Sequence, residues 1–232
     1  MTKINKNTLR IAAAVLCIAL IVLGGLIGRT RAALLEGNGA QVELGMETLA
    51  VQLTENGETV DGDGTLFNSL KDVSIDPGYT YADEIAVNNN GASEEYVRVI
   101  VTKYWTDDGG KVTTVSPDDI ELVLGNGWAA NKKESTAEQT VYYCNKSLAP
   151  GGSSTLFTGI KLDADIAGAY TIKEKSEDDK TTLIAEFKYD GLTFNVEAEA
   201  QAVQYEHGQE AAGSAWGVTN VTFNNGSVTV QD

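Results

Sequence analysis

Residues 73–105 read VSIDPGYTYADEIAVNNNGASEEYVRVIVTKYW, and this stretch decides the fold. Apolar and polar residues alternate over residues 84–89, with the period of a pleated strand. Residues 88–91 interrupt the pattern, because asparagine and glycine tolerate left-handed backbone. Residues 96–104 are rich in β-branched and aromatic side chains and are too apolar for an exposed strand. The stretch therefore predicts two antiparallel strands and a protein built around a sheet.

Outward from this stretch, short alternating segments recur between turn residues. The Asp-Gly pair within residues 187–194 predicts a two-residue hairpin, and residues 218–230 predict a terminal one. The charged run at 173–180 predicts an exposed loop tip, and residues 211–215 a brief helical turn. About ten strands at this spacing predict an all-β fold, in which residues 34–232 form a single jelly-roll-like antiparallel β-sandwich.

The N-terminal 33 residues have the features of an export signal. Basic side chains precede an uncharged apolar run at residues 11–27, which predicts a signal helix. Small residues follow it, so we expect cleavage in the region of Ala32, Ala33 and Leu34. Two arginines just beyond the apolar run also suit a retained membrane anchor, so both outcomes stay open at this point.

The composition argues against several classes of function. A formal net charge of −16 repels phosphate backbones, so we expect no nucleic-acid partner. His207 is the only histidine, so a two-histidine zinc site and an HExxH motif are absent. Cys144, in the segment TVYYC, fits a buried small side chain better than a nucleophile, although pairing of His207 with Cys144 or with a serine stays open. We therefore expect no catalytic residues, no cofactor and no metal site.

One acidic turn invites a calcium interpretation. Residues 61–64 read DGDG, but an EF-hand loop starting there requires glycine where Leu66 stands and glutamate where Asp72 stands. The failed pattern favours a solvated acidic turn. Calcium bound between loops of the fold remains an open alternative.

Three tryptophans, Trp105, Trp128 and Trp216, allow a second alternative. Aromatic side chains exposed on a lectin-like sandwich can stack on sugars. Tryptophan at a strand end more commonly packs in a core, which is the interpretation we favour.

The hydrophobic alternation changes faces near residues 47–48. Ala40, Val42, Leu44 and Met46 are apolar at even positions, whereas residues 49–53 are apolar at odd positions. A shift of one residue exchanges the faces of a strand, so this is either a bulge or the junction of two strands. If there are two strands, the first has an apolar face that suits the open sheet edge of a neighbouring subunit. Residues 34–47 are therefore a candidate donor strand for polymerisation, with an ordinary edge strand as the alternative.

Several of these stretches, taken in order, resemble the TasA/camelysin family of exported bacterial surface and biofilm-matrix proteins. The similar blocks are residues 49–51, 76–78, 85–91, 96–99, 148–151 with 156–157, and 197–204 with 216–217, and the N-terminal signal precedes them. The resemblance implies a jelly-roll sandwich, export by a dedicated signal peptidase and assembly into extracellular fibres. Camelysins have been linked to metalloprotease activity, but this chain offers no ligand set for it.

We therefore expect a secreted, non-enzymatic structural protein of a bacterial surface or biofilm matrix. Its expected partners are further copies of itself, a signal peptidase during export, and other matrix proteins or polysaccharide. The alternative function is a carbohydrate-binding surface adhesin with a lectin-like β-sandwich.

Overall fold

A computed structural model describes residues 49–60, 62, 64–70, 73, 75–177 and 180–231. The chain divides into two compact units, Met1–Met46 and Glu47–Asp232, and all described residues belong to the second unit. The predicted signal segment lies outside the described residues. Within the described part of the chain, no helix has the length and apolar character needed to cross a membrane.

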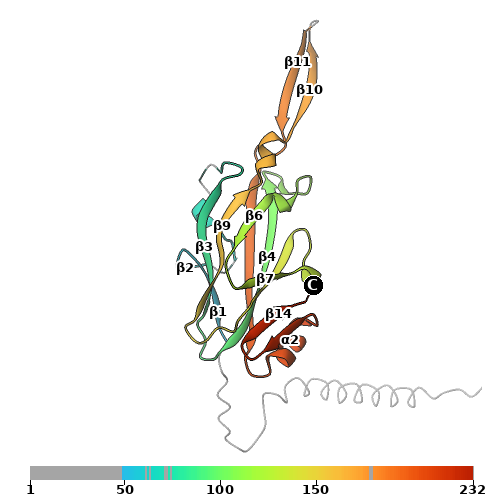
Figure 1. Cartoon of the computed structure of the whole chain (residues 1–232). Helices are drawn as coiled ribbons and strands as arrows, with labels where there is room; N and C mark the ends of the chain where they lie inside the picture. Colours follow the sequence, from blue (N-terminus) through green and yellow to red (C-terminus); the bar gives the residue numbers. More distant parts are fainter. Residues whose placement is uncertain are drawn as a thin grey trace, which may run out of the picture. The chain divides into compact units, whose positions relative to one another are not determined.

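Antiparallel sheets dominate the described unit (Figure 1). The first sheet has the order β2 (Glu58–Thr59), β1 (Val51–Glu55), β3 (Thr80–Asn89), β9 (Ser153–Leu162) and β6 (Ile120–Leu124). The second has the order β12 (Thr193–Gln204), β4 (Glu95–Asp107), β8 (Gln139–Cys144) and β7 (Trp128–Asn131), with β5 (Gly110–Val112) paired to β4. Short 3-10 turns are η1 (Asn68–Leu70), η2 (Pro117–Asp119), η3 (Lys132–Glu134) and η4 (Ala164–Gly168).

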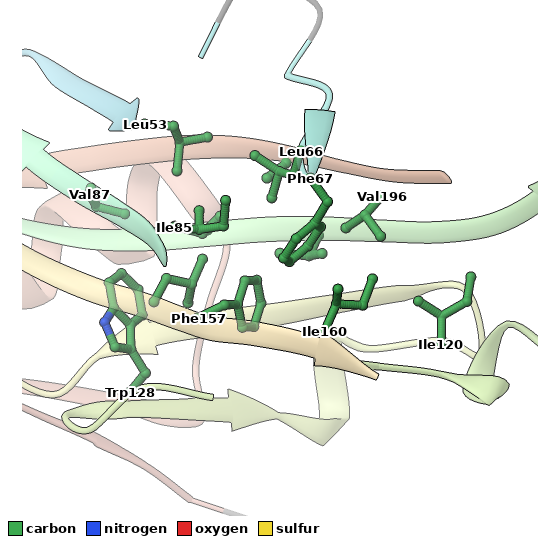
Figure 2. Close-up of a cluster of buried hydrophobic side chains, with 14 of the residues drawn as sticks. Leu53, Leu66, Phe67, Ile85, Val87, Ile120, Trp128, Phe157, Ile160 and Val196 are labelled. Atoms are coloured by element: carbon green, nitrogen blue, oxygen red, sulfur yellow. The ribbon is translucent and has the colours of Figure 1, made fainter. Parts of the chain in front are cut away.

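The main core lies between these two sheets. Ile85 of β3 and Phe157 of β9 belong to the same buried cluster as Val99 of β4 and Val196 of β12, and each is at most 1% exposed. Figure 2 shows side chains from both sheets pointing into this shared space. The two sheets therefore pack face to face, and the predicted all-β architecture and the buried character of residues 96–104 are confirmed.

The pairing predicted for the two strands of residues 73–105 is wrong. β3 pairs with β1 and β9 in the first sheet, whereas β4 pairs with β12 and β8 in the second. The connecting residues 90–94 cross between the sheets, and the Asn89 side chain anchors them by donating to the backbone oxygens of Ser93 and Leu148. Alternation of side chains specifies the faces of a strand but not its neighbour, which is why both strands were predicted correctly and their pairing was predicted wrongly.

A second correction concerns residues 170–194. The charged run is not a loop over its whole length, because residues 173–177 and 180 lie in a hairpin of β10 (Tyr170–Glu177) and β11 (Lys180–Phe187) that extends beyond the sandwich in Figure 1. Asp190-Gly191 does not join paired strands, since β11 pairs with β10 and β12 pairs with β4. Lys173 forms a 2.6 Å ion pair with Glu186, its diagonal neighbour across this hairpin. Charged composition alone therefore did not distinguish a solvated strand from a loop.

The C-terminal residues form a third layer on the outer face of the second sheet. It contains α2 (Gly208–Trp216), β13 (Val221–Asn224) and β14 (Ser227–Val230), which agrees with the predicted helical turn and terminal hairpin. Ala212 of α2 and Phe223 of β13 pack with Tyr96 and Tyr143 of the sheet in a separate buried cluster. Both faces of β4 are consequently covered.

Candidate functional site

The most distinctive functional feature is the edge of β12 that faces away from β4, called here the free edge. β12 pairs with β4 along its whole length, from Thr193 to Gln204. On the other side, only residues 64–66 pair with it among the described residues: Leu66 N–H donates to Val196 O, and Ala198 N–H donates to Gly64 O, each at 2.9 Å.

The remainder of the free edge offers unused backbone groups. Alternate residues of a strand point their N–H and C=O groups to the same side, so Ala200 and Ala202 point theirs in the same direction as Val196 and Ala198. No described residue forms a backbone hydrogen bond with Ala200 or Ala202 on that side. The free edge therefore presents donors and acceptors to an additional strand.

An open groove runs beside the free edge, between β12 and β1. Its volume is about 520 Å³, and we call it the β1–β12 groove. Its lining residues are Val51, Gln52, Leu53, Val60, Gly62, Gly64, Ala198, Glu199 and Ala200. Ala200 and Ala202 are only half-buried although they pack against the main core, because their side chains are too small to fill the gap.

The opposite wall of the groove is hydrogen-bonded over part of its length. β1 pairs with β3 on one side, and on the other it pairs with β2 at Thr54 and Glu55, with Val60 N–H donating to Leu53 O at 3.0 Å. An added strand would therefore bond mainly to β12 and pack against β1. Such an addition would satisfy the free edge and bury apolar side chains in the groove at the same time.

A buried carboxylate lies near the end of β12. Glu95, which is opposite Gln204 in the strand register, is 0% exposed, and neither carboxylate oxygen has a hydrogen-bond partner among the described residues. Removal from water raises the pKa of Glu95 to about 7, and the nearby backbone amide of Ala50 offsets part of the rise. Glu95 is therefore largely protonated below pH 7, at the point where the chain enters β1.

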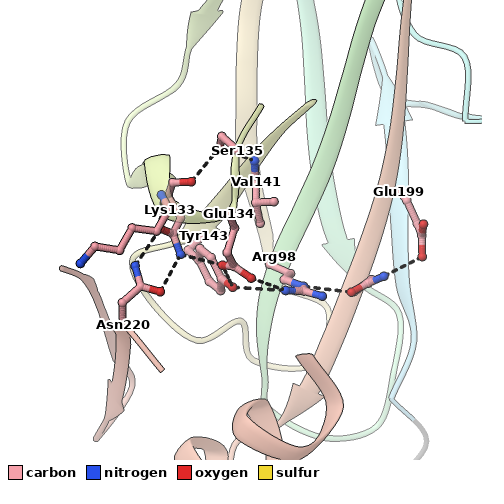
Figure 3. A network of polar contacts seen from close by, with 10 residues as sticks. Arg98, Lys133, Glu134, Ser135, Val141, Tyr143, Glu199 and Asn220 are labelled. Carbon is pink, nitrogen blue, oxygen red and sulfur yellow. Dashed lines mark hydrogen bonds and ion pairs between the residues drawn. The ribbon is translucent and has the colours of Figure 1, made fainter. Parts of the chain in front are cut away.

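A polar network on the outer face of the second sheet ties its strands to the third layer (Figure 3). Arg98 donates to Gln201 Oε1 at 2.9 Å and forms an ion pair with Glu134 at 3.1 Å. Its guanidinium also lies 4.7 Å from the ring centroid of Trp216 in α2. Tyr143 donates to Glu134 at 2.6 Å, and burial together with this bond raises the pKa of Tyr143. The polar groups of this network bond to one another, so the network stabilises the fold. The β1–β12 groove therefore remains the candidate site.

The tryptophans do not form an exposed platform. Trp105 and Trp128 are 3% and 5% exposed, and their indole N–H groups donate to Ser116 O and Ser154 Oγ, each at 2.9 Å. The packing interpretation is confirmed for both, so a sugar-binding surface made of all three tryptophans is excluded.

Cys144 and His207 are not brought together. Cys144 is buried in the main core, as predicted, whereas His207 is exposed beside α2 on the outer side of the second sheet. Within the described residues, no group of three or more histidine, cysteine or acidic side chains is placed to hold a metal ion. Asp61 and Asp63 of the acidic turn lie outside those residues.

Two sets of predicted site residues also lie outside the described residues. These are the candidate donor positions Ala40, Val42, Leu44 and Met46 and the cleavage region Ala32, Ala33 and Leu34. Comparisons with protein-family models, with curated proteins and with solved structures each found no match for this chain.

Proposed function

We propose that this chain is a secreted, non-enzymatic structural protein of a bacterial surface or biofilm matrix, whose subunits join by strand donation. Residues 40–46 of one subunit would add to the free edge of β12 in the next and fill its β1–β12 groove. The observation that carries the proposal is that, among the described residues, the edge of β12 beyond residues 64–66 is unpaired and lies beside an open groove. A head-to-tail contact of this kind generates an open filament rather than a closed ring.

The strand order supports this proposal, because the body resembles a jelly roll with one position unfilled. In a jelly roll of eight strands the last strand lies between the first and the third. If the two-residue β2 is left aside, β1, β3 and β4 are the first three strands of the body and β12 the last. β12 pairs with β4, but β1 pairs with β3 in the other sheet. Among the described residues no strand fills the position between β1 and β12, which supports this position as the acceptor of a donated strand.

The candidate donor has the right character for this position. It offers four alternating apolar side chains, Ala40, Val42, Leu44 and Met46, opposite the small inward residues of β12. Since β1 and β12 run in opposite directions, a strand antiparallel to β12 would run parallel to β1. A donor strand from the same chain would finish at the end of β1 that is far from Val51. Residues 47–50 alone would then have to run back along β1 to reach Val51. A neighbouring subunit is free of this constraint.

The predicted signal segment and the resemblance to matrix proteins support the extracellular assignment. On this proposal the partners are other copies of the chain, a signal peptidase during export, and other matrix proteins or polysaccharide. The adhesin alternative has lost its tryptophan platform, because Trp105 and Trp128 are buried.

The proposal is tested with two matched lysine substitutions on β12. Ala200→Lys places a long cation in the groove. Glu199 borders the groove, but its carboxylate accepts a hydrogen bond from Gln201 at 2.7 Å on the opposite face of β12, so Glu199→Lys places the same side chain on that exposed face. We expect electron micrographs of the secreted chain to show filaments for wild type and Glu199→Lys and none for Ala200→Lys. Circular dichroism should show that all three are folded. A wild-type chain that stays monomeric at high concentration, or normal filaments of Ala200→Lys, would contradict strand donation into this groove.

A further inference from the structure

The free edge of β12 is partly occupied by its own chain. Residues 64–66 lie antiparallel to it around the pair Thr65 and Glu197, held by the two backbone hydrogen bonds that flank this pair. This short segment is in line with the vacant positions at Ala200 and Ala202. It therefore occupies the start of the strand position that the proposed function leaves for a donor.

The side chains that follow fill the core as a strand would. Leu66, Phe67 and Leu70 are 3%, 1% and 8% exposed and belong to the main core. Residues 64–70 thus supply apolar side chains beside Val196 and Ala198. A donated strand would supply apolar side chains beside Ala200 and Ala202. We call residues 64–70 the plug.

The backbone of the plug is strained and weakly held. Phe67 has a φ of 59°, a left-handed conformation that is unfavourable for a bulky residue, and Gly64 has a φ of 70°. A side chain at Gly64 would place its Cβ 2.3 Å from Ala198 O, so only glycine lets the plug approach β12 this closely. Two backbone hydrogen bonds, at Gly64 and Leu66, flank its one residue pair with β12, whereas β4 forms twelve residue pairs with β12.

On the other side the plug rests on polar side chains of the first sheet. The amides of Asn68 and Ser69 donate to the Glu55 carboxylate at 3.1 and 3.0 Å, and Ser69 Oγ donates to Asp83 at 2.5 Å. Solvent can replace bonds of this kind when the segment leaves. A cleft of about 680 Å³, lined in part by Leu66, Phe67 and Leu70, also gives the plug space to move.

We propose that residues 64–70 are a removable plug that self-complements the free subunit and is displaced by the strand of a second copy. This inference rests on the proposed function and extends its acceptor surface along β12 from Ala200 and Ala202 to Val196 and Ala198. A donated strand first bonds to the vacant end of the edge and then takes over the two bonds of the plug. Its apolar side chains replace those of Leu66 and Phe67. The free subunit therefore stays soluble until another copy is available.

A reversible lock tests the displacement. Thr65→Cys/Glu197→Cys joins the plug to β12 at an antiparallel pair without mutual hydrogen bonds, where the side chains are close enough for a disulfide. Cys144 is buried and Cys17 lies in the predicted signal segment, so the introduced thiols are the ones available for pairing. The matched control is Thr222→Cys/Thr229→Cys, an exposed cross-strand pair of the terminal hairpin, away from the groove.

The oxidised lock should stay monomeric in light scattering and electron microscopy, and a reducing agent should restore filaments. The oxidised control should form filaments as wild type does. If the oxidised lock forms filaments at the wild-type rate, displacement of the plug is contradicted. If wild type forms no filaments, the proposed function itself is contradicted. Phe67→Ala provides a second readout: a weakened plug should shorten the lag before filaments appear, and a folded Phe67→Ala chain with a longer lag would contradict displacement.

Discussion

Filaments should be absent from a chain that lacks residues 34–46, although its sandwich should still fold. Every strand that the structure describes in the two sheets lies C-terminal to the deletion, and the buried cluster of the described residues runs from Leu53 to Ala198. The monomer therefore keeps its core and loses only the strand that it donates. The measurement is size-exclusion chromatography with light scattering, followed by electron microscopy of the monomer fraction. If the truncated chain forms normal filaments, this segment is not the donor.

A point substitution tests whether assembly requires the apolar face of residues 40–46, and not merely the presence of the segment. Leu44→Glu places a charge on the predicted donor face, and a buried unpaired charge strongly disfavours docking. Gln41→Glu adds the same charge on the opposite face of the same strand and serves as the matched control. We expect only Leu44→Glu to block filaments. Equal loss in both variants would show that the charge, and not the apolar face, decides assembly.

Glu95→Gln should remove a large part of the pH dependence of stability. Burial raises the pKa of Glu95 from 4.5 to about 7 in the folded chain. Below pH 4.5 this side chain is protonated both folded and unfolded, so it adds no pH dependence there. Between pH 4.5 and 7 the unfolded chain loses the proton while the folded chain retains it, so the free energy of unfolding falls as pH rises. At about 1.4 kcal/mol per pH unit, the loss is on the order of 3 kcal/mol by pH 8.

Urea denaturation at pH 5 and pH 8 measures this effect. The glutamine variant should gain stability relative to wild type on going from pH 5 to pH 8, because it has no proton to lose. Glu84→Gln, on the exposed face of β3, removes the same charge without removing a buried group and should leave the wild-type pH dependence in place. An unchanged pH dependence in Glu95→Gln would mean that this carboxylate is hydrated in solution.

The alternation of residues 96–104 predicted the inner face of β4, with Val97, Val99 and Val101 all buried, since it depends only on the period of a strand. Continued two residues toward the N-terminus, the same alternation places Glu95 inside. The alternation therefore indicated a buried position for Glu95, but the charge of this side chain argued against it, because charged residues are rarely buried in a core.

Features that depend on pairing between distant segments could not be predicted. The β1–β12 groove exists because β1 pairs with β3 and not with β12, and no local pattern in residues 51–55 encodes that choice. Likewise, the plug depends on a φ of 59° at Phe67, where local propensity favours another conformation. Tertiary packing decides both features.

Disulfide formation between two different copies tests strand donation most directly. One chain carries Leu44→Cys and a second, purified separately, carries Ala200→Cys, so any disulfide between these positions must join two subunits. When the two chains are mixed under oxidising conditions, they should form a disulfide-linked heterodimer as filaments grow. Its mass distinguishes it from either homodimer. Leu44→Cys mixed with Glu199→Cys should not cross-link, because the Glu199 side chain points to the opposite face of β12, where it accepts a hydrogen bond from Gln201. Filaments that grow without the Leu44–Ala200 cross-link, or that cross-link equally to Glu199→Cys, would contradict donation into the β1–β12 groove.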